Sequence, residues 1–223
     1  MLACPTFTFK TALYMRYIVD LEEVEKGVCI YLPRTEQVRV TYEQLQKDGY
    51  KIGFPFWAKI WASARAMLLF LQKEPGWVEN KLVLEIGAGI GLPSLLIAKY
   101  ASQIIISDYD IDAVELLQQN ILHLGLVNAE ARCLDWNDFP NDLHADTVVL
   151  SDINYDPEQF EALIKLINRF LSNGATVIVA TPQRIMAVPF AEKINLSIVQ
   201  SNIYKIDENG KEFDVSIFVL KRR

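Results

Sequence analysis

The sequence has few of the residues that build metal sites and disulfide frameworks. Its 223 residues contain three cysteines, Cys4, Cys29 and Cys133, and two histidines, His123 and His144. No two cysteines have a Cys-x-x-Cys spacing, and neither histidine has a metal-ligand partner at helical spacing. Cysteines that are scattered and odd in number argue against a disulfide framework. We therefore expect a protein without a metal and without disulfides.

Long apolar runs and an excess of basic residues are also missing. No apolar run approaches the roughly 20 residues that a membrane helix needs, and the N-terminal residues lack the basic-then-apolar pattern of a signal peptide. The net charge is −6 and the pI about 5.1, whereas nucleic-acid-binding proteins usually present a basic face. We expect a cytoplasmic protein with no membrane or nucleic-acid partner, and a charge balance that suits basic substrates.

About half of the residues are apolar, which indicates one folded α/β domain. We expect residues 1–53 to form an N-terminal extension of that domain. Within it, two stretches of alternating residues, Cys29–Leu32 and Gln37–Thr41, predict a β-hairpin with Pro33 in its turn. We expect residues 54–223 to form the Rossmann-like core of the domain.

The core alternates between helical and strand patterns. It begins with apolar residues at helical spacing over Trp57–Leu71. Leu82–Ile86 is then a continuous apolar run, typical of a parallel strand buried on both faces. Two β-rich runs near the C-terminus, Ile198–Ile206 and Phe213–Leu220, predict an antiparallel hairpin. The other predicted strands are 104–106, 129–134, 147–150 and 176–180, and the other predicted helices are 92–100, 111–124 and 158–171. Alternation of this kind predicts a doubly wound α/β sheet with right-handed crossovers.

A glycine-rich segment, Glu85–Gly91, follows the first buried strand and opens a helix. Gly87 and Gly89 permit a tight turn and a close approach by a ligand. A dinucleotide-binding loop would need Gly or Ala three residues after Gly89, where Leu92 stands instead. No Gly-Lys-Ser/Thr sequence is present to hold a triphosphate. The carboxylate of Glu85 suits a ligand with positive charge, such as a sulfonium that carries an α-amino group.

The next two strands also end in carboxylates. Asp108 stands 21 residues after Gly87, a distance at which an acidic side chain accepts hydrogen bonds from ribose. Asp135 is placed to accept from an adenine amino group, with Trp136 beside the ring. Each feature also has a structural interpretation: the glycine turn as a turn only, Asp108 with Asp110 as a helix cap, and Asp135 as the start of a loop. Their joint placement on consecutive strands favours ligand binding.

Five segments together carry a family resemblance. They are Pro55-Phe56-Trp57-Ala58-x-x-Trp61, Glu85–Gly91, Ser107-Asp108, Leu134-Asp135-Trp136 and Asp152-Ile153-Asn154-Tyr155. This pattern resembles class I methyltransferases and, within them, the family-16 protein lysine methyltransferases. The first segment is similar to the branch that methylates the electron-transfer flavoprotein β subunit, although Ala62-Ser63-Ala64 stands where that branch has Pro-Gly-Gly. The resemblance implies a Rossmann-like, seven-stranded, mostly parallel sheet with the C-terminal antiparallel hairpin and helices on both faces.

The resemblance also implies the cofactor and the roles of the site residues. S-adenosyl-L-methionine is the implied cofactor, with Trp61 against it, the glycine loop at its methionine end and Asp108 at its ribose. Asp152 and Tyr155 are the implied catalytic residues and face the methyl acceptor. The residues implied to bind the cofactor are Trp61, Glu85, Gly87, Ala88, Gly89, Asp108, Asp135, Trp136 and Ser151. For the tryptophans of the first segment, a purely structural role in the core is the alternative.

The residues that follow Asp152 limit the chemical class of the methyl acceptor. Methyltransferases of nucleic-acid amines often carry two prolines at this point, and Ile153 and Asn154 replace both. Together with the acidic pI, this disfavours a base as the acceptor. We expect methylation of lysine side chains in a protein. A small-molecule amine as acceptor is one alternative, and a protein that binds the cofactor without catalysis is another, although the intact Asp-x-x-Tyr motif favours catalysis.

Overall fold

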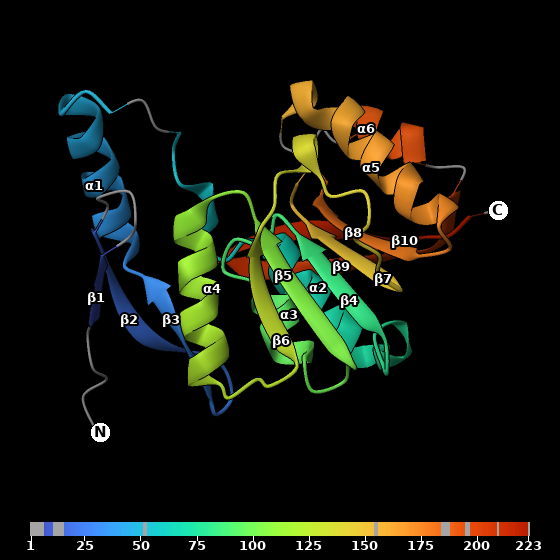
Figure 1. Cartoon of the computed structure of the whole chain (residues 1–223), viewed down its shortest axis with the longest axis horizontal. Coiled ribbons are helices and arrows are strands. Elements are labelled where there is room, and N and C mark those ends of the chain that lie inside the picture. The colour runs from blue at the N-terminus through green and yellow to red at the C-terminus, as the bar shows by residue number, and fades with distance from the viewer. Residues whose placement is uncertain are drawn as a thin grey trace.

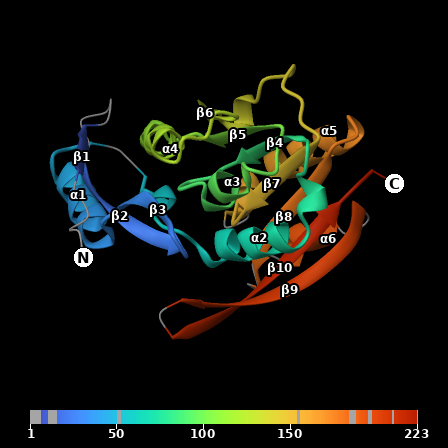
Figure 2. The same cartoon turned by 90° about the horizontal axis from the view of Figure 1, so that it is seen from below.

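The computed structural model describes residues 7–10, 16–50, 53–153, 156–183, 188–194, 197–208 and 210–222 (Figure 1). These residues form a three-stranded antiparallel sheet near the N-terminus and a seven-stranded sheet with its covering helices in the rest of the molecule. The small sheet and helix α1 stand at one side of the large sheet, and helix α4 lies between them (Figures 1 and 2). No helix in the described ranges is both long and apolar enough to cross a bilayer.

The N-terminal hairpin differs from the predicted one. The elements here are β1 (Phe7–Lys10), β2 (Arg16–Glu25), β3 (Val28–Pro33) and α1 (Thr35–Lys47). The prediction of a strand at Gln37–Thr41 is wrong, because these residues lie in α1, and β3 pairs with β2 instead. Over five residues, the alternation around Val38 fits a strand and a helix equally well. Val38 is buried and Leu45, seven residues later, is half-buried against the same core, which is a helical period.

The large sheet has the strand order β6-β5-β4-β7-β8-β10-β9. Its strands are β4 (Leu82–Ile86), β5 (Gln103–Asp108), β6 (Ala129–Cys133), β7 (Thr147–Ser151), β8 (Thr176–Pro182), β9 (Ile198–Glu208) and β10 (Lys211–Leu220). Strands β4 to β8 are parallel, and β10 is antiparallel to both β8 and β9. The predicted seven-stranded, doubly wound sheet with its C-terminal hairpin is thus confirmed. The chain order reverses between β4 and β7, and open α/β sheets bind ligands at such a point.

Helices cover both faces of the sheet. They are α2 (Ala62–Lys73), α3 (Leu92–Ile97), α4 (Ile111–His123), α5 (Phe160–Ser172) and α6 (Val188–Ile194). One hydrophobic cluster joins α2, α3 and α4 to one face, and a second joins α5 and α6 to the other. The sequence did not predict α6. The first turn of the predicted helix Trp57–Leu71 is wrong, because Phe56–Ala58 is a 3-10 turn (η1) and Trp61, with extended backbone, only caps α2.

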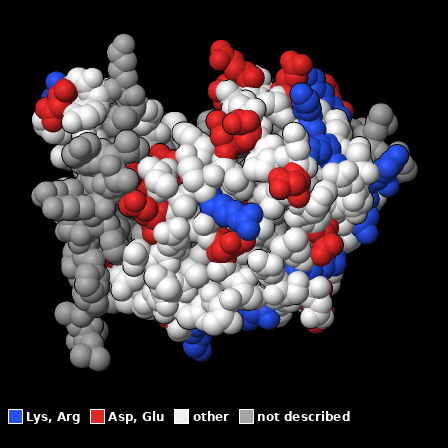
Figure 3. All heavy atoms as spheres, viewed as in Figure 1, with Lys and Arg blue, Asp and Glu red and all other residues white. Residues whose placement is uncertain are grey.

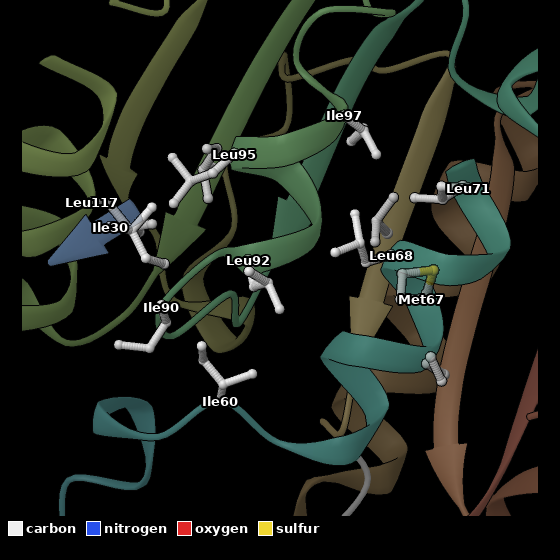
Figure 4. Close-up of a cluster of buried hydrophobic side chains, with 14 of the residues drawn as sticks. Ile30, Ile60, Met67, Leu68, Leu71, Ile90, Leu92, Leu95, Ile97 and Leu117 are labelled. Carbon is white, nitrogen blue, oxygen red and sulfur yellow. The ribbon is translucent and has the colours of Figure 1, made fainter. Parts of the chain in front are cut away.

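Apolar packing fixes the segment before α2 to the glycine loop. Alternate residues of β4 enter different clusters, Val83 on the α2 face and Leu84 on the α5 face. On the α2 face, Ile60 and Ile90 lie next to each other, beside Leu92 at the start of α3 (Figure 4). The segment with the two tryptophans is therefore part of the core and not a free loop.

Candidate active site

A cavity opens where β4, β5 and β7 end, at the reversal of the strand order. The empty space within it, open mouth included, is about 700 Å³. Eight of the eleven predicted site residues line it: Trp61, Gly87, Ala88, Gly89, Asp108, Trp136, Ser151 and Asp152. Of the other three, Glu85 lies below the cavity, Asp135 lies outside its wall, and Tyr155 falls outside the described residues, as does Asn154.

The glycine loop has the conformation that the sequence predicted. Gly87 and Gly89 have φ values of +65° and +55°, in the left-handed region that favours glycine. A Cβ atom on Gly87 would lie 3.1 Å from Ile153 Cγ2, and one on Gly89 would lie 3.0 Å from the carbonyl oxygen of Trp57. Both positions therefore require glycine for conformation and for space, and the backbone itself forms this wall of the cavity.

Asp108, at the end of β5, is turned toward the glycine loop. Its Oδ2 accepts a hydrogen bond of 2.8 Å from the backbone amide of Gly89, and its Oδ1 accepts one of 3.0 Å from Asp110. The side chain is almost fully buried, and this burial raises its pKa to about 6 although the backbone hydrogen bonds act in the opposite direction. A carboxylate has about four lone-pair sites, so Asp108 keeps capacity for further donors such as ribose hydroxyls.

Glu85 is fully buried beneath the loop, on the face of β4 that α3 covers. Burial raises its pKa from 4.5 to about 7, while the hydroxyl and backbone amide of Ser94 act in the opposite direction. Among the residues that the structure describes, no donor, Ser94 included, makes a full hydrogen bond to either carboxylate oxygen, so the opposing effect of Ser94 acts at longer range. The predicted contact between Glu85 and the cofactor stays a prediction, and from this position its charge reaches the cavity without a direct wall contact.

The capping roles fall to Asp110 and Asp135. The side chain of Asp110 accepts from the amide of Asp112 and caps α4, so Asp108 itself is not the helix cap. Asp135 is exposed, and its Oδ1 accepts from both the backbone amide and the side chain of Asn137 in the turn η3 (Trp136–Asp138). The structure therefore does not favour Asp135 as the adenine acceptor. Trp136 does line the cavity, and its Nε1 donates to Gln159 Oε1 at 3.0 Å.

Ser151 and Asp152 form the wall contributed by β7. The hydroxyl of Ser151 is buried and has no hydrogen-bond partner among the residues that the structure describes. Asp152 has a φ of +58°, and its backbone amide donates to the carbonyl of Ala180 at 2.9 Å. A left-handed conformation at a residue other than glycine is uncommon and costs on the order of 1–3 kcal/mol. Such strain gathers at functional sites, which favours a role for this carboxylate in the cavity.

Ten cavity residues were not predicted as site residues, and Trp57, Lys59 and Tyr109 are among them. The edge of the Tyr17 ring meets Trp57 with centroids 5.2 Å apart, so the N-terminal sheet reaches the wall of the cavity. Tyr109 directly follows Asp108, so its place at a strand end was the signal that would have identified it. Lys59 stands between the two tryptophans of the first motif, and nothing in its local sequence distinguishes it from a surface lysine.

The arrangement fits S-adenosylmethionine. Glycine backbone permits close approach, Asp108 keeps acceptor capacity, the hydroxyl of Ser151 is available, and negative charge at Glu85 suits a sulfonium and an α-ammonium. A search of the described ranges finds no group of three His, Cys, Asp or Glu side chains that could hold a metal ion.

Comparisons with known proteins agree with this assignment. Residues 44–201 match the family described as lysine methyltransferase. The chain is 25% identical over 181 residues to the protein N-lysine methyltransferase METTL21A of Xenopus tropicalis, covering 78% of this chain and 81% of the relative. It is 30% identical over 149 residues to the electron transfer flavoprotein beta subunit lysine methyltransferase of Mus musculus, covering 61% of this chain and 54% of that protein. Further relatives are named as a histone-arginine methyltransferase and as a protein N-terminal and lysine N-methyltransferase.

Solved structures show the same fold. The N-methyltransferase NodS from Bradyrhizobium japonicum WM9, in complex with S-adenosyl-L-homocysteine, superposes with a TM-score of 0.59 at 15% identity. The match covers 80% of this chain and 97% of NodS. With the cavity at the reversal of the strand order and a family match over more than half of the sequence, the chain belongs to the lysine methyltransferase family and is an S-adenosylmethionine-dependent methyltransferase.

Proposed function

We propose that this enzyme methylates the ε-amine of lysine side chains in a protein. The observation that carries the proposal is Asp152: a carboxylate at the cavity wall, in a strained backbone conformation, directly after the strand that flanks the glycine loop. A negative charge at this place attracts a cationic acceptor. The names of two relatives, which specify protein lysine, support the same acceptor. A cytoplasmic location stays a prediction from the sequence.

The surface charge also suits a basic acceptor. The net charge of the chain is −6. Figure 3 shows several acidic side chains on the upper half of the face in view, the half toward which β5 and β6 run in Figure 1, with basic side chains beside them mainly on the right. A field of this sign raises the local concentration of cationic partners and repels nucleic acid. The charge distribution therefore favours a protein segment with lysine over a polyanionic acceptor.

The residues of the cavity have distinct tasks in this reaction. S-adenosylmethionine, when bound, supplies a methyl group on a positively charged sulfur. A free lysine amine has a pKa of about 10.4 and is about 99.9% protonated near neutral pH, and only its neutral form is a nucleophile. The apolar wall of Ile60, Trp61 and Ile153 removes water from the amine, which lowers its pKa. The proton leaves to solvent before the attack.

Asp152 acts on the same pKa in the opposite direction, because a carboxylate stabilises the ammonium form. We therefore assign Asp152 to capture and orientation of the lysine and not to a general-base role. Most of the rate comes from holding the amine in line with the methyl group, since orientation of this kind contributes about 7–11 kcal/mol. Tyr155 stays the predicted second residue of the acceptor side.

The experiment is methyl transfer from labelled S-adenosylmethionine by the purified enzyme in a fractionated host lysate. We expect label in a protein band and, after complete hydrolysis of that band, in methyllysine. Label in methylarginine or at a protein N-terminus would replace lysine by another protein amine. Label confined to the small-molecule fraction would overturn the proposal in favour of a small-molecule amine. The variant Gly89→Val, which should not bind the cofactor, gives the background.

A further inference from the structure

The cavity wall contains one basic side chain among the described residues, that of Lys59. Its other charged residues are Asp108 and Asp152, and Glu85 lies buried below. This cavity must accept a cofactor whose amino-acid end carries a carboxylate in addition to its ammonium and sulfonium charges. These carboxylates give the cavity a negative field, which suits the cationic groups of the ligand in general. The same field repels its carboxylate, so that group needs a separate cationic partner.

Lys59 is held in place from two sides. Its Nζ donates to Oε2 of Glu208 at 3.0 Å and lies 4.5 Å from the ring centroid of Trp61, which itself lines the cavity. Glu208 is the last residue of β9 and follows Lys59 by 149 positions. The carboxylate of Glu208 is mostly buried, while the side chain of Lys59 is 45% exposed. The C-terminal hairpin thus fixes the ammonium at the mouth of the cavity.

The ion pair does not use all the donors of Lys59. An ammonium group carries three N–H donors, and Glu208 takes one of them. A pair with a partly exposed lysine adds little to stability, so fold stability alone is a weak reason for the contact. The remaining donors and the exposed side of the ammonium are available to an anion that enters the cavity.

We propose that Lys59 binds the α-carboxylate of S-adenosylmethionine and that Glu208 is the positioning residue that holds its ammonium beside Trp61. This inference rests on the proposed cofactor site and assigns one group of the ligand to one side chain. Lys59 neutralises the only anionic group of the ligand, and the tether to Glu208 spares the ligand the cost of ordering a long flexible side chain.

The test is calorimetric binding of two ligands, S-adenosylmethionine and its decarboxylated form, to the full-length protein. Wild type should bind the decarboxylated ligand at least 10-fold more weakly. Lys59→Met should bind S-adenosylmethionine about 10-fold more weakly than wild type and bind the two ligands within twofold of each other. Lys59→Arg should keep the preference of wild type, and Glu208→Gln should reduce it. Retained binding of the decarboxylated ligand shows that each variant is folded.

Lys205→Met is the matched control. Lys205 lies on β9, as Glu208 does, and its ammonium pairs with the carboxylate of Glu212 at 2.6 Å, but Lys205 does not line the cavity. This variant also removes one positive charge, and its preference for S-adenosylmethionine over the decarboxylated ligand should stay within twofold of wild type. A larger change in Lys205→Met would mean that the net charge of the protein, and not Lys59 itself, sets the preference. A full preference retained in Lys59→Met, or no preference in wild type, overturns the inference while the cofactor site stands. Failure of wild type to bind either ligand would instead overturn the proposed function itself.

Discussion

The backbone amide of Gly89 donates a hydrogen bond of 2.8 Å to Oδ2 of Asp108, 19 residues further along the chain. This bond joins the loop after β4 to the end of β5. The same carboxylate therefore orders the glycine loop and lines the cavity that the loop encloses. Its loss should affect cofactor binding in two ways, through the acceptor that is removed and through the loop that is released.

Asp108→Ala should weaken S-adenosylmethionine binding by at least about 10-fold. The substitution removes hydrogen bonds to a charged group, each of which contributes about 1.5–3 kcal/mol. Isothermal calorimetry on the folded variant measures the change. Asp135→Ala is the control, since Asp135 is an exposed turn residue outside the cavity wall, and its affinity should stay within about twofold of wild type. A large loss in Asp135→Ala with none in Asp108→Ala would reverse the two assignments.

Gly89→Ala should abolish cofactor binding, whereas Gly125→Ala should not. The two glycines have nearly the same φ, +55° and +64°, so alanine meets a similar backbone strain of about 1–2 kcal/mol at each. They differ in space, because a Cβ on Gly89 would press on the backbone of Trp57 and a Cβ on Gly125 meets no atom within 4 Å. Thermal unfolding and calorimetry on both variants separate strain from site geometry. Equal affinities in the two variants would show that the close approach at Gly89 does not matter for binding.

Glu85→Gln should stabilise the cofactor-free protein at pH 8 relative to wild type, but not at pH 5. Burial raises the pKa of Glu85 from 4.5 to about 7, so the folded state holds this proton more tightly than the unfolded state does. The resulting stability is fully present below about pH 4.5 and is lost as the pH rises through about 7. Glutamine cannot ionise and avoids this loss, of which about 2–3 kcal/mol falls between pH 5 and pH 8.

Thermal unfolding of wild type and Glu85→Gln across pH 5 to 8 measures this difference. The melting temperature of the variant relative to wild type should rise by roughly 4–10 °C between the two ends of this range. The difference between pH values is the decisive quantity, because any packing change from glutamine is the same at every pH. A constant offset would mean that Glu85 does not titrate in this window. Cofactor affinity at pH 8 should fall in the variant, since a negative charge beneath a cationic ligand is lost.

The inner strands β4, β5, β7 and β8 were predictable because they are short apolar runs buried on both faces, as in Leu82–Ile86. The glycine loop was predictable because its sequence, its preceding strand and its following helix are all local. The stretch around Val38 was misjudged because five residues do not separate a period of 2 from one of 3.6. In the structure β3 forms its hairpin with β2, and no pattern in the local sequence indicates this pairing.

Long-range contacts explain what the sequence did not reveal in the site. Lys59 lines the cavity, and its partner Glu208 lies 149 positions further along the chain. The position of Trp57 depends on packing against Tyr17 from the N-terminal sheet and against Gly89 from the glycine loop. Asp135 shared the strand-end position of Asp108, but its side chain turned back to Asn137. The place of a residue at a strand end therefore predicted correctly that it lies at this edge of the sheet. It did not predict whether the side chain points into the cavity.

In the proposed mechanism, Asp152 divides the cavity into a cofactor side and an acceptor side. The variant Asp152→Asn keeps the size of the side chain and removes its charge. On one folded preparation, we expect affinity for S-adenosylmethionine within about threefold of wild type. Methyl transfer to the protein acceptor should fall by 10²-fold or more, equivalent to at least about 2.7 kcal/mol. Near-normal transfer by Asp152→Asn, or loss of cofactor binding in place of transfer, would contradict the account.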